Sequence, residues 1–358
     1  MTVAVSDAEF KLATAACRSA FAGGSAAELE PLARSVTWDR FVKVAARHRV
    51  QALCWHGLEP IHDLIPSDIA DDLRLKAVGI IESNLRIAAE SARLLALFSS
   101  AGLPLLFLKG LSLDALAYRS PFLKMGWDID LLIAPERLQE AALLLRTAGY
   151  ASTTPKSDGV ELQQWHDRRK ESVWRHAAYG IHLDLHTRLA DHPALLSKLG
   201  IDCPTQVVTI AKGIELPTLG RDELFAYLTV HGASSAWFRL KWITDLAALL
   251  HGECANEIER LYECSQQLGA GRAAGQALLL GERLYAIDIG ERLHGQLYSD
   301  PIIRWLAELA WRQIARISEP TSRPLGTATI HLSQPFLLPG WRFKLSEAIR
   351  QMNATARS

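Results

Sequence analysis

Cysteine pairs, long apolar runs and a secretory leader are all missing from this sequence. Its five cysteines are scattered and form no C-x-x-C pair, which argues against both a disulfide framework and a zinc knuckle. No segment approaches the roughly 20 consecutive apolar residues that cross a bilayer. The N-terminal residues lack the basic and apolar regions of a signal peptide. We therefore expect a cytoplasmic protein with reduced cysteines and no membrane partner.

The sequence also lacks an excess of either charge and several common catalytic motifs. Its 39 Lys and Arg residues balance 39 Asp and Glu residues, whereas binding an extended nucleic acid usually needs a basic surface. It contains no G-x-x-x-x-G-K-[ST], no H-R-D with D-F-G and no G-x-S-x-G. These absences argue against a P-loop NTPase, a protein kinase and an α/β-hydrolase.

The 358 residues are enough for two or three domains, and the 49% apolar content is that of a globular protein. The periodicity predicts an N-terminal helical region over residues 1–100, a mixed core over 101–190 and a C-terminal helical domain over 191–358. The fold class is therefore α+β, with a small mixed-sheet core between helical regions. No role is predicted for residues 320–358, which begin a stretch rich in Pro, Gly and Thr.

Short apolar runs and turn residues define the elements of the middle segment. A proline at the start of one helix and a glycine just after it are the usual signals at those ends. In chain order, we expect a strand over 103–108, a helix over 111–118, a strand over 128–133, a helix over 135–148 ended by Gly149, and strands over 172–175 and 181–187.

Acidic residues alternate with apolar ones in two of these strands. Alternate side chains of a strand share a face, so Asp128 and Asp130 point the same way, as do His182, Asp184 and His186. If the two strands are neighbours, three carboxylates meet on one patch. Carboxylates held so close repel one another unless a cation is present, and such oxygen ligands suit Mg²⁺ or Mn²⁺ with phosphate oxygens. The alternative is solvated charges on an edge strand.

Two histidines in the second strand allow a different metal site. His182 and His186 flank Asp184 in an H-x-D-x-H pattern, and imidazole is a common ligand of zinc. On this interpretation the protein is a zinc-dependent hydrolase. The Asp128 and Asp130 pair would then have no clear role.

Five segments together resemble a known family. They are FVKVAARHRVQAL, LLFLKGLSLDALAY, KMGWDIDLLI with a following helix that ends in AGY, IHLDLHTRL, and LTVHGASSAWFRLKWITDLAALL. They span about residues 35–250, and the combination is similar to the uncharacterised nucleotidyltransferase family of the DNA-polymerase-β-like superfamily. The resemblance implies transfer of a nucleoside monophosphate from an NTP to an acceptor, with pyrophosphate released. It also implies that Asp128, Asp130 and Asp184 are the catalytic residues and hold the metal ions.

The sequence departs from that superfamily in its expected phosphate contacts. Lys109 and Gly110 replace the usual Gly-Ser turn, and Lys124 stands where this branch commonly has Arg. A lysine keeps the charge but loses the bidentate fork of arginine. Glycine at a helix N-terminus lets free backbone amides approach a phosphate. The residues expected to bind substrate are Lys109, Gly110, Ser112, Lys124, His186, Arg239 and Asp245; ordinary packing is the alternative for the last two.

The acceptor is not visible in the sequence. A protein, a peptide, a sugar, a small molecule or an RNA end would each fit, as would any of the NTPs. A third interpretation keeps the fold without turnover, as a module that binds a nucleotide or a partner protein.

Overall fold

The computed structural model describes residues 8–124, 126–316, 318–322 and 325–355. Contacts divide the chain into two compact units, one formed by residues 1–80 and 228–358 and the other by residues 81–227. Helices α5 (Ser67–Ser100) and α9 (Arg221–Ser234) each contribute to both. In the parts of the chain described, no helix is both long enough and apolar enough to cross a bilayer.

The first unit is helical in its described residues. Local sequence accounts for where α14 begins: the Asp300 side chain accepts hydrogen bonds from the backbone amides of Ile302 and Ile303, and Pro301 occupies the first helical position. Besides its parts of α5 and α9, its elements are α1 (Ala8–Ala22), α2 (Ala26–Ala33), α3 (Trp38–His48), α4 (Gln51–Gly57), η1 (Glu59–Leu64), α10 (Leu240–Leu249), α11 (Ala255–Gln267), α12 (Gly271–Tyr285), α13 (Glu291–Ser299), α14 (Pro301–Ile314), η3 (Pro320–Ser322), α15 (Ala328–Ser333), η4 (Gln334–Phe336) and α16 (Trp341–Thr355).

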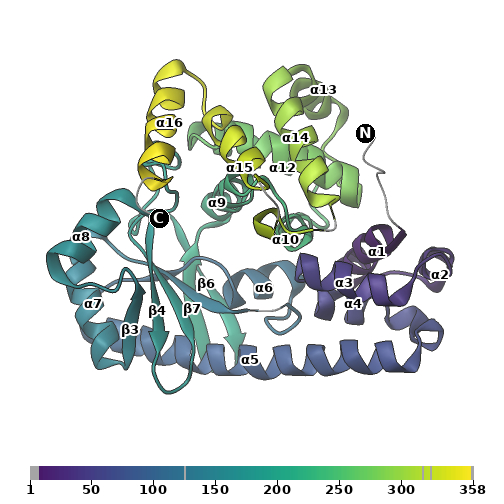
Figure 1. The fold of residues 1–358 in the computed structure, drawn as a ribbon, viewed down its shortest axis with the longest axis horizontal. Helices are drawn as coiled ribbons and strands as arrows, with labels where there is room; N and C mark the ends of the chain where they lie inside the picture. Colours follow the sequence, from purple (N-terminus) through teal and green to yellow (C-terminus); the bar gives the residue numbers. More distant parts are fainter. Residues whose placement is uncertain (1–7, 125, 317, 323–324, 356–358) are drawn as a thin grey trace. The chain divides into compact units, whose positions relative to one another are not determined.

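The second unit contains a five-stranded mixed sheet in the order β1-β2-β5-β4-β3 and a separate β6-β7 hairpin. Figure 1 labels β3 and β4 of the sheet and both strands of the hairpin. The central pair, β2 and β5, is parallel, and the other neighbours in the sheet are antiparallel. The strands and helices of this unit are β1 (Leu106–Phe107), α6 (Leu111–Tyr118), β2 (Asp128–Leu132), η2 (Pro135–Arg137), α7 (Leu138–Thr147), β3 (Tyr150–Thr154), α8 (Gly159–Arg168), β4 (Glu171–His176), β5 (His182–His186), β6 (Thr205–Ala211) and β7 (Ile214–Leu219).

Alternation along the central strands builds the core of this unit. Ile129 and Leu131 of β2 and Leu183 and Leu185 of β5 are all buried in one cluster, together with Trp174 of β4. Burial of such side chains stabilises the fold by about 1.5–3 kcal/mol each. Because neighbours in a strand point to opposite faces, the acidic residues between them all lie on the other face.

The predicted fold class is confirmed: a mixed sheet lies between helical regions along the chain. The expected strands and helices of the middle segment are present, and α7 ends as predicted before Gly149, whose φ is +94°. A side chain at Gly149 would also collide with His176, since its Cβ would lie 2.9 Å from His176 Nε2. Elements that the sequence analysis missed are β3, α8, β6 and β7, of which the last two lie in a range expected to be helical.

The contact-based units change near residues 80 and 227, whereas the sequence analysis placed its regions at 1–100, 101–190 and 191–358. Helix α5 passes from one unit into the other without a break, and its residues Ile87, Leu94 and Phe98 belong to the core of the sheet-containing unit. Val208 and Leu216 of the hairpin join the same core. The core therefore extends in sequence beyond residues 101–190 on both sides, because packing rather than sequence distance decides which residues it includes.

Candidate active site

Asp130 and Asp184 face each other across the two parallel strands. The register pairs Asp130 with Asp184 and Asp128 with His182, so the three carboxylates share the face opposite the apolar core. The sequence analysis required the two strands to be neighbours, and the parallel pairing of β2 with β5 meets that condition. Asp130 is buried, whereas Asp128 and Asp184 are half-buried.

The electrostatic consequence is clearest at Asp184. Burial, reinforced by the negative charges of Asp130 and Glu171, raises the pKa of the Asp184 carboxyl to about 8. A carboxyl group so perturbed beside other carboxylates is typical of a functional site. Near neutral pH, a bound cation would offset both the burial and the negative charges that keep Asp184 protonated.

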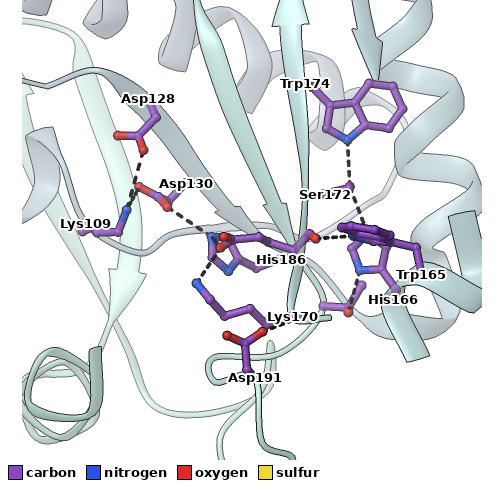
Figure 2. Close-up of polar contacts among 12 residues, drawn as sticks. Lys109, Asp128, Asp130, Trp165, His166, Lys170, Ser172, Trp174, His186 and Asp191 are labelled. Atoms are coloured by element: carbon purple, nitrogen blue, oxygen red, sulfur yellow. Dashed lines mark hydrogen bonds and ion pairs between the residues drawn. The ribbon is translucent and has the colours of Figure 1, made fainter. Parts of the chain in front are cut away.

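Lys109 supplies a positive charge to the other two carboxylates. Its Nζ lies 2.5 Å from Asp130 Oδ2 and 3.9 Å from Asp128 Oδ2 (Figure 2). Burial acts to lower the pKa of Lys109, but the charges of Asp130 and Asp128 outweigh it and hold that pKa well above its usual value. The ammonium group is therefore charged, and it lies where a metal ion bound to the same carboxylates would compete with it.

His186 holds the other oxygen of Asp130. Its Nε2 donates to Asp130 Oδ1 at 3.1 Å and lies 3.2 Å from Glu171 Oε2. Burial acts to raise the pKa of Asp130, but Lys109 and His186 outweigh it and lower that pKa. Asp130 is therefore ionised and held at both carboxylate oxygens.

Glu171 is a fourth acidic residue that the sequence analysis missed. It lies on β4 directly opposite His186 and accepts a hydrogen bond from Lys170. Burial acts to raise the pKa of Glu171, but His186 and Lys170 outweigh it and lower that pKa. No motif in the sequence marks this residue, because its place beside His186 depends on the antiparallel register of β4 and β5.

A candidate metal group is formed by Asp130, Asp184 and His186, whose ligand atoms lie within 4.8 Å of one another. The two carboxylates suit a hard cation such as Mg²⁺. With two carboxylate oxygens as acceptors, the proton of His186 is best placed on Nε2, which makes that nitrogen a donor rather than a ligand. Asp128 lies outside this group but on the same face, so the residues present fit a divalent cation held mainly by oxygen.

The zinc arrangement of His182, Asp184 and His186 is not supported by this geometry. Residues four apart in a strand are separated by about 13 Å, too far for both imidazoles to bind one ion. His182 is also exposed, whereas His186 is completely buried. Among the residues that the structure covers, no metal group includes His182.

Gly110 and Ser112 lie at the start of α6, close in sequence to Lys109. Gly110 has φ +67° and ψ −128°, a conformation that only glycine adopts without strain. Ser112 is buried, and its hydroxyl group has no hydrogen-bond partner within the described residues. The conformation of Gly110 is the one expected of a turn that exposes backbone amides; phosphate binding there stays a prediction.

Lys124 lies in a different environment from the one we expected. Its side chain is buried, and Nζ forms an ion pair of 2.8 Å with Asp114 Oδ1 of α6, which is buried as well. The carboxylate of Asp114 thus already forms an ion pair with the ammonium group of Lys124. The predicted contact with phosphate therefore competes with an ion pair inside the protein.

Arg239 and Asp245 belong to the helical unit, whereas the carboxylates belong to the other unit. Arg239 forms an ion pair with Glu319 at 3.2 Å and lies over the rings of Phe238 and Trp242. Asp245 is buried in α10. These contacts agree with the packing alternative, and substrate binding by either residue stays a prediction.

Comparison with known proteins finds one family for this chain. Residues 34–286 match the model of a family described as "Uncharacterised nucleotidyltransferase". The match covers more than half of the chain and includes every residue of the site described above. No curated protein matches the chain significantly.

Proposed function

The chain belongs to the uncharacterised nucleotidyltransferase family, and we propose that it transfers a nucleoside monophosphate from an NTP to an acceptor and releases pyrophosphate. The observation that carries this proposal is the pairing of Asp130 with Asp184 on adjacent parallel strands. A carboxylate pair with a strongly perturbed pKa has little structural use, whereas it can hold a cation next to a triphosphate.

In this proposal Asp128, Asp130 and Asp184 hold Mg²⁺ or Mn²⁺. Such an ion, when bound, neutralises charge on the phosphates and lowers the pKa of a coordinated hydroxyl. His186 keeps Asp130 oriented through Oδ1. Lys109 would contact the phosphates once the carboxylates have a different counter-ion, and the turn at Gly110 would offer backbone amides to the same group.

The reaction joins an acceptor oxygen to the α-phosphorus and breaks the bond from that phosphorus to the bridging oxygen of pyrophosphate. The acceptor loses a proton in the process. The proposed acceptors are a protein side chain, a peptide, a sugar, a small metabolite or an RNA end. The test is mass spectrometry of candidate acceptors after incubation with each labelled NTP and Mg²⁺, together with an assay for pyrophosphate.

The possible outcomes of that test distinguish a nucleotidyltransferase, a non-catalytic binding module and a hydrolase. An acceptor that gains the mass of a nucleoside monophosphate supports the proposal. Metal-dependent binding of an NTP without pyrophosphate release in the presence of any acceptor class would instead indicate a non-catalytic module. Stoichiometric zinc in the purified protein, with hydrolysis but no transfer, would revive the hydrolase interpretation.

Asp184→Asn should slow the chemical step more than it weakens NTP binding. Asparagine keeps the shape of the side chain but removes the charge next to the proposed acceptor. We expect kcat to fall by about 10²–10³-fold, with a much smaller change in the Kd of a non-hydrolysable NTP analogue. Equal losses in kcat and in analogue binding would contradict the assignment of Asp184.

The affinity for Mg²⁺ or Mn²⁺ should rise with pH. Since the pKa of Asp184 is about 8 and the carboxyl must lose its proton to bind a cation, affinity should increase up to about tenfold per pH unit below pH 8 and level off above it. Titration calorimetry between pH 6 and pH 8.5 would measure this slope, and the Asp184→Asn variant should flatten it.

The same group should make the metal-free protein less stable as pH rises. From the ordinary pKa of 3.8 to about 8, folded Asp184 keeps a proton that the unfolded chain has released. Its contribution to the free energy of unfolding therefore falls across that window. The free energy of unfolding is measured against pH without metal for the wild type and for Asp184→Asn. A wild-type profile that does not fall relative to the variant in this pH range would contradict the raised pKa assigned to Asp184.

A further inference from the structure

A buried asparagine on α5 holds the loop that leads into Asp128. Asn84 is completely buried, and its Nδ2 donates to the backbone carbonyls of Pro121 at 3.1 Å and Lys124 at 2.7 Å. Its Oδ1 accepts from the backbone amide of Gly126 at 3.2 Å. One side-chain amide thus binds three backbone groups spread over a few residues of the loop.

The loop is also anchored from α6. The Lys124 side chain extends to Asp114, and that ion pair lies inside the protein. The carbonyl of the same Lys124 is one of the two that Asn84 binds. Gly126 fits closely against the asparagine, since a Cβ there would lie 3.1 Å from Asn84 Oδ1 and 3.5 Å from Ile87 Cδ1. Helix α5 therefore holds the loop through the side chain of Asn84, and helix α6 holds it through the side chain of Asp114.

The carboxylate that follows this loop, Asp128, has a long ion pair and a partly exposed side chain. Asp128 is the first residue of β2, and its side chain is 37% exposed. It is not part of the group formed by Asp130, Asp184 and His186, and its ion pair with Lys109 is long, at 3.9 Å. Its position is therefore set mainly by the backbone that precedes it.

We propose that Asn84 is a positioning residue: it fixes the loop around Lys124 and Gly126 and, through that backbone, places Asp128 for catalysis. This inference rests on the proposed function. Two donors and one acceptor of a single planar amide match two carbonyls and one amide of the loop, a match that no apolar side chain can supply. A displacement of about 1 Å in a catalytic group can cost about 10²-fold in rate.

The experiment compares Asn84→Ala and Asn84→Asp with Ser83→Ala, a matched control on the neighbouring position of α5. Three quantities are measured at a temperature well below unfolding: deuterium uptake of the peptide that contains Gly126, the Kd for Mn²⁺, and kcat and KM for the NTP. A merely structural role would lower the unfolding temperature and leave kcat of the folded enzyme unchanged.

We expect Asn84→Ala to speed exchange at Gly126 by tenfold or more, to weaken Mn²⁺ binding and to lower kcat by about 10²-fold with little change in KM. Asn84→Asp keeps the acceptor for Gly126 but replaces both donors with an oxygen that faces two carbonyl oxygens, so it should be at least as impaired as Asn84→Ala. Ser83→Ala should match the wild type in all three.

The readouts separate failure of the inference from failure of the proposed function. If the wild type transfers no nucleotide, deuterium uptake and Mn²⁺ affinity still decide whether Asn84 positions Asp128. Unchanged exchange at Gly126 in Asn84→Ala would overturn the inference, whatever the activity. Faster exchange with wild-type Mn²⁺ affinity and, in an active enzyme, wild-type kcat would overturn it as well, because the loop would then not govern Asp128.

Discussion

Asp130→Asn should lower the rate of nucleotidyl transfer by about 10³-fold or more. Asp130 is the carboxylate with the most contacts at the site: Lys109 lies on Oδ2, His186 lies on Oδ1, and Asp184 faces it on the next strand. An asparagine cannot supply the negative charge that holds the cation, and that cation stabilises the developing charge by several kcal/mol. Each 1.36 kcal/mol corresponds to tenfold in rate.

The control is Glu136→Gln, which likewise exchanges a carboxylate for an amide in the same unit, but at an exposed position outside the site. Both proteins should give the circular dichroism spectrum of the wild type, because asparagine has the size of aspartate. Pyrophosphate release under single-turnover conditions measures the chemical step. Wild-type turnover in folded Asp130→Asn would remove the proposed mechanism, since no other residue pairs with Asp184 across β2 and β5.

Lys124→Met should destabilise the protein by about 3–5 kcal/mol, which is a large part of the stability of an ordinary domain. The variant removes the ammonium that pairs with Asp114 at 2.8 Å and so takes a positive charge away from that buried carboxylate. Taking away one member of a buried pair costs far more than the pair contributes, because the remaining charge stays in a medium of low dielectric. Urea denaturation followed by fluorescence would measure the change.

Lys124→Arg is the matched variant, because it keeps the charge and can reach Asp114 with a different head group. We expect it to retain most of the stability that Lys124→Met loses. The double variant Lys124→Met with Asp114→Leu should recover part of the loss, since no buried charge then remains. A Lys124→Met protein of normal stability whose KM for NTP rises would show that Lys124 serves the phosphates rather than Asp114.

The central strands of the sheet were accessible from the sequence because their signal is local. Apolar and acidic residues alternate in the strands around Ile129 and Leu183, and this alternation alone predicts which side chains face the core. The strand β3 and the hairpin β6-β7 carry a weaker alternation with more polar residues. Their inclusion depends on packing against residues far away in the chain, which no window of sequence contains.

The residues of the site divide in the same way into those that a local sequence pattern indicates and those that only packing brings together. Asp128, Asp130 and Asp184 could be proposed from their spacing, and adjacency of their strands followed as a condition. Glu171 and Asn84 could not be proposed, because each is an isolated polar residue whose importance comes from a partner elsewhere: His186 across a strand pair for one, and a loop about 40 residues later for the other. Lys124 was assigned to phosphate because it stands where the resembled family commonly has Arg, and its ion pair with Asp114 could not be read from the sequence.

By itself, the sequence determined the alternation that sends the acidic residues to one face of two strands, the turn conformation that needs Gly110, and the family to which the chain belongs. Only the tertiary structure decided that Asp130 stands opposite Asp184, that Lys109 lies between two carboxylates and that Lys124 is turned inward to Asp114. The reason is physical: local patterns specify which way a side chain points, whereas pKa values and ion pairs depend on distances between charges, and those distances exist only after the strands and helices have packed.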